Sequence, residues 1–258
     1  KGYLSNLVFR KAIAYAVNRF ESRAFQGRST LINSAAPIGS SRYNPKVTGY
    51  DLVTRKDKKN FKKILDQLEK QEKFKLDRKK NNINNIMYEV SEGNWKKIKL
   101  VIIYNYSDTR GSELEALRNM QNYLITNLGI DVKLRKVQRT NWKTKLRKSK
   151  QWDLAYDKII VEEGQSLDSY YSSNGTFNKK TTKYRNSLVD RLIKEEKANL
   201  LSPLQSTQTG KQLMQALSDD VASIFLWSLD SYYVYNKTLI HPKNKTYVNY
   251  YNFFTEPH

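Results

Sequence analysis

The chain has 258 residues, of which 39% are hydrophobic and 12% aromatic, enough apolar side chains for one substantial core or two modest ones. It has no cysteine, which excludes disulfides, thiolate zinc sites and a cysteine nucleophile, and its two histidines, His241 and His258, argue against a histidine triad or a multi-histidine metal site. The sequence contains no apolar run of about 18 residues, so we predict no transmembrane helix. Because it starts at Lys1 with neither an initiator methionine nor a signal peptide, we expect the chain to be a piece of a longer protein or a processed form.

The formal net charge is +21, and the basic residues are unevenly spread. Residues 133–150 carry nine lysines and arginines and no acidic residue. Such a stretch would attract nucleic acid, an anionic membrane surface or an acidic ligand. A solvated surface is the alternative, and we favour it because no nucleic-acid recognition motif accompanies the charge.

The N-terminal part begins with a predicted amphipathic helix over residues 7–20, followed by an irregular loop over 28–52 and a second helix over 57–72. The polar stretch 75–95 has little periodicity and is interpreted as an insertion or a mobile hairpin. The apolar stripe expected for the first helix consists of Val8, Phe9, Ala12, Ile13, Ala16, Val17 and Phe20.

The clearest local unit is a strand over 98–104, a helix over 112–127 and a strand over 130–137. Ser112 and Glu115 match a capping box at the helix start, and Gly129 is placed to end the helix. Strand, helix and strand at this spacing predict a crossover between parallel strands and therefore an α/β fold.

The rest of the chain continues the alternation of helix and strand. We predict a short helix over 141–149, a strand over 153–160 and helices over 187–201 and 207–221, with Thr209 and Gln212 as a second capping box. Residues 224–236 are predicted to be extended, and the tyrosine-rich tail over 245–254 to form a strand pair or an interface arm.

Several motifs occur in the order known from one family of proteins. The first helix fits a "V-R-x-A-I-x-x-A-I-D/N-R" pattern, and a glycine and a proline turn follow it. Later segments fit a "Y-x-P … Y-D" loop, a helix that ends "L-x-x-x-G-I-x-V-x-L", and a "Y-x-N-x-x-V-D-x-L-I" helix. The matching residues are Arg10, Ala12, Ile13, Ala16, Val17, Asn18, Arg19, Gly27, Pro37, Tyr43, Pro45, Tyr50, Asp51, Leu124, Gly129, Ile130, Val132, Leu134, Tyr184, Asn186, Val189, Asp190, Leu192 and Ile193.

Over about 230 residues the chain resembles the second lobe of family 5 extracytoplasmic solute-binding proteins of ABC importers, the oligopeptide, dipeptide and nickel class. The resemblance implies a class II periplasmic-binding-protein lobe with a mixed sheet flanked by helices. It implies that residues 1–230 form this lobe and that 231–258 return toward a first lobe that lies upstream. It also implies a non-enzymatic protein without a cofactor, located outside the cytoplasm in the periplasm or as a lipid-anchored lipoprotein. Its partners would be a peptide or similar small solute and a membrane permease, with no specific nucleic acid.

The resemblance also suggests where a ligand would bind. Peptide binders of this class carry "W-x-x-D-Y-x-D-P" after the strand that here starts at Asp153, and their aspartate pairs with the amino terminus of the ligand. The acidic position falls on Glu162, with Glu163 next to it, and a solvated loop carboxylate is the alternative. The tryptophan position holds Ile159, and the Asp-Pro pair is absent. Ser40, in a Ser- and Gly-rich loop, and Tyr170 complete the expected ligand-binding residues, with packing against the core as the favoured alternative for Tyr170.

Two other functions remain open. The chain could be a basic module that binds nucleic acid or another polyanion, in which case its affinity would fall steeply with salt. It could also be a relative that has lost transport and serves as a surface adhesin or scaffold, which the missing tryptophan and Asp-Pro pair make plausible.

Overall fold

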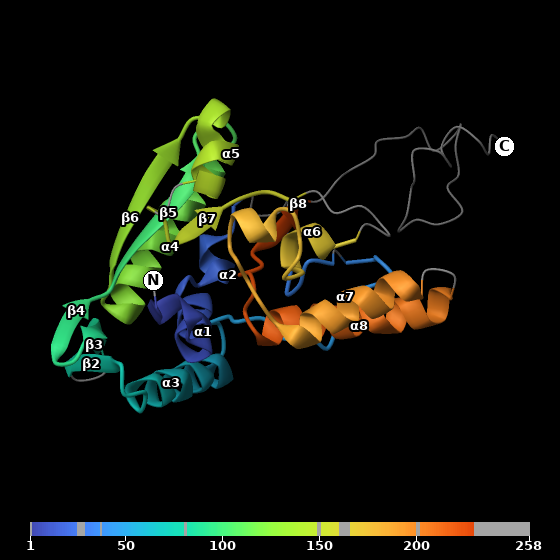
Figure 1. Ribbon diagram of the computed structural model, residues 1–258. Coiled ribbons are helices and arrows are strands. Elements are labelled where there is room, and N and C mark those ends of the chain that lie inside the picture. Colours follow the sequence, from blue (N-terminus) through green and yellow to red (C-terminus); the bar gives the residue numbers. More distant parts are fainter. Residues whose placement is uncertain are drawn as a thin grey trace, which may run out of the picture. The chain divides into compact units, whose positions relative to one another are not determined.

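The computed structural model describes residues 2–24, 29–36, 38–79, 82–148, 151–159, 166–199 and 202–229 (Figure 1). The contacts divide the chain into one unit of residues 1–228 and a second of residues 229–258. The tyrosine-rich tail predicted over 245–254 lies outside the described residues. The elements below belong to the first unit, in which β8 (Trp227–Leu229) begins and pairs with β1 (Ser29–Leu31).

The first helix lies in the main core. A 3-10 turn, η1 (Gly2–Ser5), leads into α1 (Leu7–Ala16), whose start is capped by the Asn6 side chain accepting from the Phe9 amide at 3.0 Å. α1 contacts α3 (Arg55–Glu69) and α4 (Ser112–Leu128), and its Phe9 and Ile13 are almost completely buried in the main core.

The predicted stripe is wrong at its C-terminal end. Asn18 has a left-handed backbone with φ of 44°, which ends α1, and the short α2 (Arg19–Ser22) follows in a new direction. Phe20 is therefore 46% exposed instead of buried.

The stretch interpreted as an insertion or mobile hairpin forms an antiparallel sheet in the order β2-β3-β4, with β2 (Phe74–Lys79), β3 (Asn82–Ser91) and β4 (Asn94–Lys97). Ile86 of β3 is completely buried in the main core. Register shifts at Asp77/Arg78 and Glu89/Ser91 interrupt the two-residue alternation, which explains why the sequence shows so little periodicity.

The predicted strand-helix-strand unit is confirmed. β5 (Lys99–Asn105) pairs in parallel with β6 (Asp131–Val137) and with β7 (Leu154–Tyr156), in the order β6-β5-β7, and α4 connects β5 to β6. Successive side chains of β5 point to opposite faces of the sheet and are buried in two different cores. Ile102 belongs to the main core shared with α1 and α4, whereas Ile103 packs with Trp142 of α5 (Arg139–Lys148). The α/β fold class is therefore correct, although β7 is shorter than the predicted strand.

Both predicted capping boxes on these helices are wrong. α4 follows Gly111, and its cap makes no side-chain hydrogen bond, so Ser112 is already its first residue. α8 (Pro203–Asp219) starts earlier than predicted, so Thr209 is buried inside the helix. Gly129 does end α4, with φ of 61°.

A second core is built by α6 (Asp168–Tyr171), α7 (Ser187–Ala198) and α8, with η2 (Asn178–Lys180) beside α6. Figure 1 shows α7 and α8 packed side by side. Between them, Arg42 forms an ion pair with the buried Glu196 at 2.6 Å. Burial raises the pKa of the Glu196 carboxyl, and the Arg42 guanidinium opposes that rise. In the described part of the chain no helix is long and apolar enough to cross a membrane.

Candidate functional site

The three parallel strands end at one edge of their sheet. β5 ends at Asn105, β6 at Val137 and β7 at Tyr156. In open α/β sheets, ligands bind in the crevice outside the carboxyl ends of the strands. This carboxyl edge is therefore the first place to look for a ligand-binding site.

The loop between β5 and α4 is fixed by its own polar side chains. The Asn105 side chain donates to Asp108 Oδ2 at 2.5 Å and accepts from the Ser107 amide at 3.1 Å, while the Asn105 carbonyl accepts from the Thr109 amide at 2.9 Å. This turn places Glu113 in the first turn of α4, where the residue is only 4% exposed.

The segment that leaves β7 supplies the partners of Glu113. Lys158 Nζ donates to Glu113 Oε2 at 2.6 Å and to the Asp108 carbonyl at 2.7 Å. Burial and the neighbouring Glu113 carboxylate raise the pKa of the Tyr156 phenol. Although Asp157 as a whole residue is exposed, partial desolvation raises the pKa of its carboxyl, and the Asp108 carboxylate adds to that rise.

The resulting cluster is locally acidic in a strongly basic chain. It joins the carboxyl groups of Asp108, Glu113 and Asp157 with the ammonium group of Lys158. Such a surface favours a cationic group of a ligand over an anionic one. Across the described residues, no three His, Asp or Glu side chains come together in a way that could hold a metal ion.

The expected ligand-binding residues fall in different places. Glu162 and Glu163 lie outside the described residues, in the segment 160–165 that begins directly after Ile159. Tyr170 lies on α6, where its ring packs against Phe177 with the ring centres 5.1 Å apart. Ser40 precedes α3 in the long loop, and its buried Oγ has no hydrogen-bond partner among the described residues. Ligand binding by all four stays a prediction.

Sequence reasoning missed the carboxyl-edge cluster. Glu113 and Lys158 are 45 positions apart, and neither belongs to a recognisable motif. The signal that could have found them is positional: Asp108 follows the first predicted strand of the parallel pair, Glu113 opens the next helix, and Asp157 and Lys158 leave the third strand.

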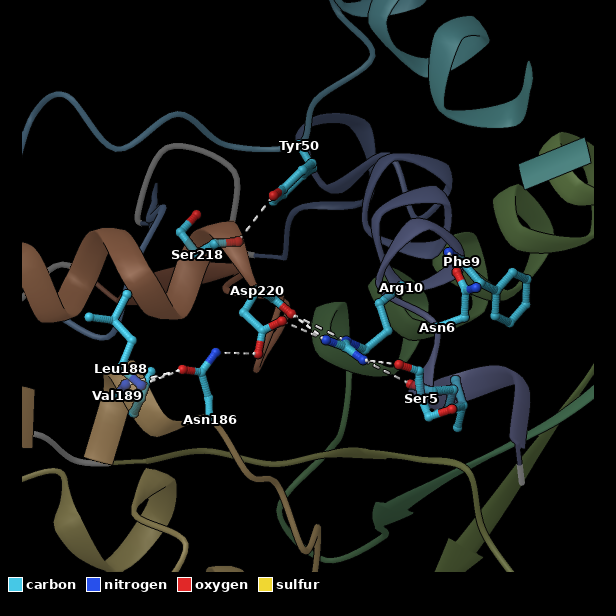
Figure 2. A network of polar contacts seen from close by, with 11 residues as sticks. Ser5, Asn6, Phe9, Arg10, Tyr50, Asn186, Leu188, Val189, Ser218 and Asp220 are labelled. Atoms are coloured by element: carbon cyan, nitrogen blue, oxygen red, sulfur yellow. Dashed lines mark hydrogen bonds and ion pairs between the residues drawn. The ribbon is translucent and has the colours of Figure 1, made fainter. Parts of the chain in front are cut away.

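A second polar network connects α1 with the ends of α7 and α8 (Figure 2). The Arg10 guanidinium donates to the Asp220 carboxylate at 2.8 Å, to the Asp220 carbonyl at 2.8 Å and to the Ser5 carbonyl at 2.9 Å. Asn186 donates to the other Asp220 carboxylate oxygen at 3.1 Å and caps α7 by accepting from the amides of Leu188 and Val189. Because these groups are engaged with one another, the network holds the helices together.

Arg19 holds the long loop between β1 and α3 in place through a similar set of hydrogen bonds. Its guanidinium donates to both carboxylate oxygens of Asp51, at 2.7 and 2.9 Å, and to the Phe225 carbonyl at 2.7 Å. It also contacts the Ile32 carbonyl and the Asn33 side chain, so all three of its nitrogens are used in a buried position. The motif residues Arg10, Arg19, Asp51 and Asn186 are therefore structural.

The fold matches solved structures of solute-binding proteins. The oligopeptide-binding protein AppA from Bacillus subtilis, in complex with a nonapeptide, is 17% identical with a TM-score of 0.67, over 88% of this chain and 42% of that one. DppA from Helicobacter pylori, in complex with the peptide STSA, is 16% identical with a TM-score of 0.65, over 88% of this chain and 39% of that one. A nickel ABC transporter protein from Bacillus halodurans is 14% identical with a TM-score of 0.65, over 89% of this chain and 44% of that one.

These likenesses show the fold, and the expected periplasmic-binding-protein class is confirmed. The chain spans about two fifths of the length of the structures that it matches. A search among curated proteins gave no significant match. The model of the bacterial extracellular solute-binding proteins, family 5, middle region, matches residues 1–181, which is most of the chain. The chain therefore belongs to the family 5 bacterial extracellular solute-binding proteins, which bind solutes and are not enzymes.

Proposed function

We propose that the chain is part of a substrate-binding protein that captures peptides and delivers them to the permease of an ABC importer. The observation that carries the proposal is the acidic carboxyl edge formed by Asp108, Glu113 and Asp157, which lies directly before the segment that contains Glu162 and Glu163. A peptide presents an ammonium group at one end, and a carboxylate partner would bind it by charge-assisted hydrogen bonds.

The remaining parts of this proposal are supported by the resemblance to the family. Residues 1–230 act as one lobe, residues 231–258 return toward a first lobe upstream, and closure of the two lobes commits the ligand. The protein acts outside the cytoplasm, in the periplasm or anchored by lipid as a lipoprotein. Peptides are favoured over nickel because the carboxyl edge suits an organic ammonium, and because two of the matched structures hold peptides.

The test uses the full-length protein and a mixed peptide library, with native mass spectrometry to detect a retained ligand. The binding of an identified peptide is then compared with that of the same peptide acetylated at its amino terminus. We expect Glu162→Gln to weaken binding of the free-amine peptide by about 10- to 100-fold, the effect of losing one charge-assisted hydrogen bond. The variant should leave binding of the acetylated peptide unchanged, because that peptide has no ammonium group.

The matched control is Glu195→Gln, which removes an exposed carboxylate from α7. If the acetylated peptide binds the unmodified protein as tightly as the free-amine peptide, ammonium recognition at Glu162 is wrong. Retention of nickel instead of a peptide would change the solute class. If neither is bound at any concentration, the adhesin or scaffold alternative replaces transport.

A further inference from the structure

The most uneven charge distribution on the described surface lies on β6 and α5. Seven exposed cations lie on these two elements, and we name this set the β6–α5 basic face; no acidic residue occurs in the sequence between Asp131 and Asp153. Among the described residues, none of the seven takes part in an ion pair. They are Lys133, Lys136, Arg139, Lys143, Lys145, Arg147 and Lys148.

The packing of α5 explains why these side chains point outward. Its apolar residues, Trp142 and Leu146, are buried against Ile103 and Val137, which leaves the opposite side of the helix entirely polar. Arg139, Lys143 and Arg147 succeed one another at i,i+4 spacing. Like charges at that spacing destabilise a helix, so α5 keeps this charge at a cost to its own stability.

The other basic helix differs in a way that makes it a useful comparison. α3 carries Asp57, Asp66 and Glu69 among its lysines, and the last two pair with Arg78. Its positive charge is therefore partly neutralised, whereas that of α5 is not.

A recess opens within the basic face. It has a volume of about 350 Å³ and is lined by cations, side-chain amides and an indole, including Arg135, Lys136, Lys145, Gln138, Asn141 and Trp152. Arg135 donates to the Gln151 carbonyl at 3.1 Å, which fixes one edge of the recess. Lysine, arginine and amide donors around a recess of this size suit the oxygens of a phosphate group.

We propose that the β6–α5 basic face docks on the anionic phosphate headgroups of a lipid bilayer and holds the protein close to the membrane. The family acts outside the cell, where such a surface is available. Nucleic acid fits less well, because no exposed residue between 133 and 148 is aromatic, and Trp152, the indole that lines the recess, is half-buried and donates to the Lys145 carbonyl at 3.3 Å. This role does not depend on the identity of the solute.

The experiment measures binding of the full-length protein, prepared without lipid modification, to vesicles by co-sedimentation. Vesicles that contain phosphatidylglycerol are compared with pure phosphatidylcholine vesicles at low salt and at about 0.15 M salt, where screening acts over about 8 Å. Each cation near an anionic surface contributes about 1 kcal/mol, or about fivefold in binding. Changing Lys143, Lys145, Arg147 and Lys148 together to Gln should therefore weaken binding to the anionic vesicles by about 100-fold or more.

The matched control changes Lys58, Lys59, Lys62 and Lys63 of α3 to Gln, which removes the same charge from exposed positions elsewhere. We expect less than a tenfold loss for this variant, and unchanged circular dichroism for both. Equal losses would overturn the proposal in favour of attraction by net charge alone, and binding to phosphatidylcholine would overturn it as well. Preference for a single-stranded oligonucleotide would indicate a nucleic-acid surface. Competition by glycerol phosphate at matched ionic strength would indicate a site for a free phosphorylated solute.

Discussion

Gly129 ends α4 with a left-handed backbone, and its surroundings allow a quantitative prediction. A Cβ atom at this position would lie 2.3 Å from the carbonyl carbon and oxygen of Asn84 and 2.7 Å from the Asn85 amide nitrogen, all backbone atoms of β3. The left-handed conformation costs an alanine about 1–2 kcal/mol. Displacement of packed backbone adds about 1–3 kcal/mol. We therefore expect Gly129→Ala to lower the free energy of unfolding by about 2–5 kcal/mol.

Gly93 provides the matched control. Its φ of 72° is also left-handed, but among the described residues no atom beyond its two chain neighbours lies within 4 Å of the Cβ position. Gly93→Ala should cost only the conformational part, about 1–2 kcal/mol. Asparagine tolerates the left-handed region, so Gly93→Asn should be nearly neutral whereas Gly129→Asn should remain costly.

The assay is urea unfolding followed by tryptophan fluorescence and circular dichroism, with the slope of the transition checked for constancy between variants. The difference between the two alanine variants isolates the contact with β3. Equal midpoints for Gly129→Ala and Gly93→Ala would refute the close approach of α4 and β3 at this point.

Three further predictions concern positions next to or within buried polar contacts. Gly210 lies inside α8, where replacing glycine by alanine normally stabilises a helix by about 1 kcal/mol. The Cβ atom of an alanine at this position would lie 2.7 Å from Arg42 Cγ and 2.9 Å from Glu196 Oε1, so Gly210→Ala should lower the melting temperature, whereas Gln212→Ala at an exposed position should not. Arg19→Lys leaves Asp51 and the carbonyls around it with one nitrogen in place of three, and we expect urea titration to show a loss of about 3 kcal/mol. Burial raises the pKa of Tyr171 to about 12, so the unfolded chain releases this proton at a lower pH than the folded chain, and the free energy of unfolding should fall as pH rises from 10 to 12. Tyr171→Phe should make that fall shallower by about 1.4 kcal/mol per pH unit, and an unchanged slope would contradict the prediction.

The motif residues show which properties of the protein a family resemblance can predict. The order of the motifs along the chain, which include Arg10, Arg19, Asp51 and Asn186, predicted the family, and the family match confirmed it. The structure shows what these residues do: Arg10 and Asn186 share Asp220, and Arg19 ties Asp51 to two distant carbonyls. A motif preserves the residues that a fold requires, so recognising it identifies the fold more directly than the ligand.

The errors in the predicted elements have local causes. The three-stranded sheet over 74–97 was missed because two register shifts interrupt its alternation. The cap predicted at Ser112 was wrong because Gly111, with φ of 52°, already provides the turn into α4. Phe20 was assigned to the core because periodicity alone does not show that Asn18 breaks the helix.

The sequence by itself determined the α/β class, the strand-helix-strand unit around α4, the glycine that ends this helix, and the family. These features depend on contacts between neighbours in the chain, such as periodic burial and helix termination, or on the linear order of motifs. Only the tertiary structure decided that Glu113 meets Lys158, that Gly129 touches β3, that Arg42 pairs with Glu196, and that the exposed cations of β6 and α5 form no ion pair among the described residues. Charges and backbones far apart in sequence come together only when the strands align and the helices pack, and local propensity carries no information about that arrangement.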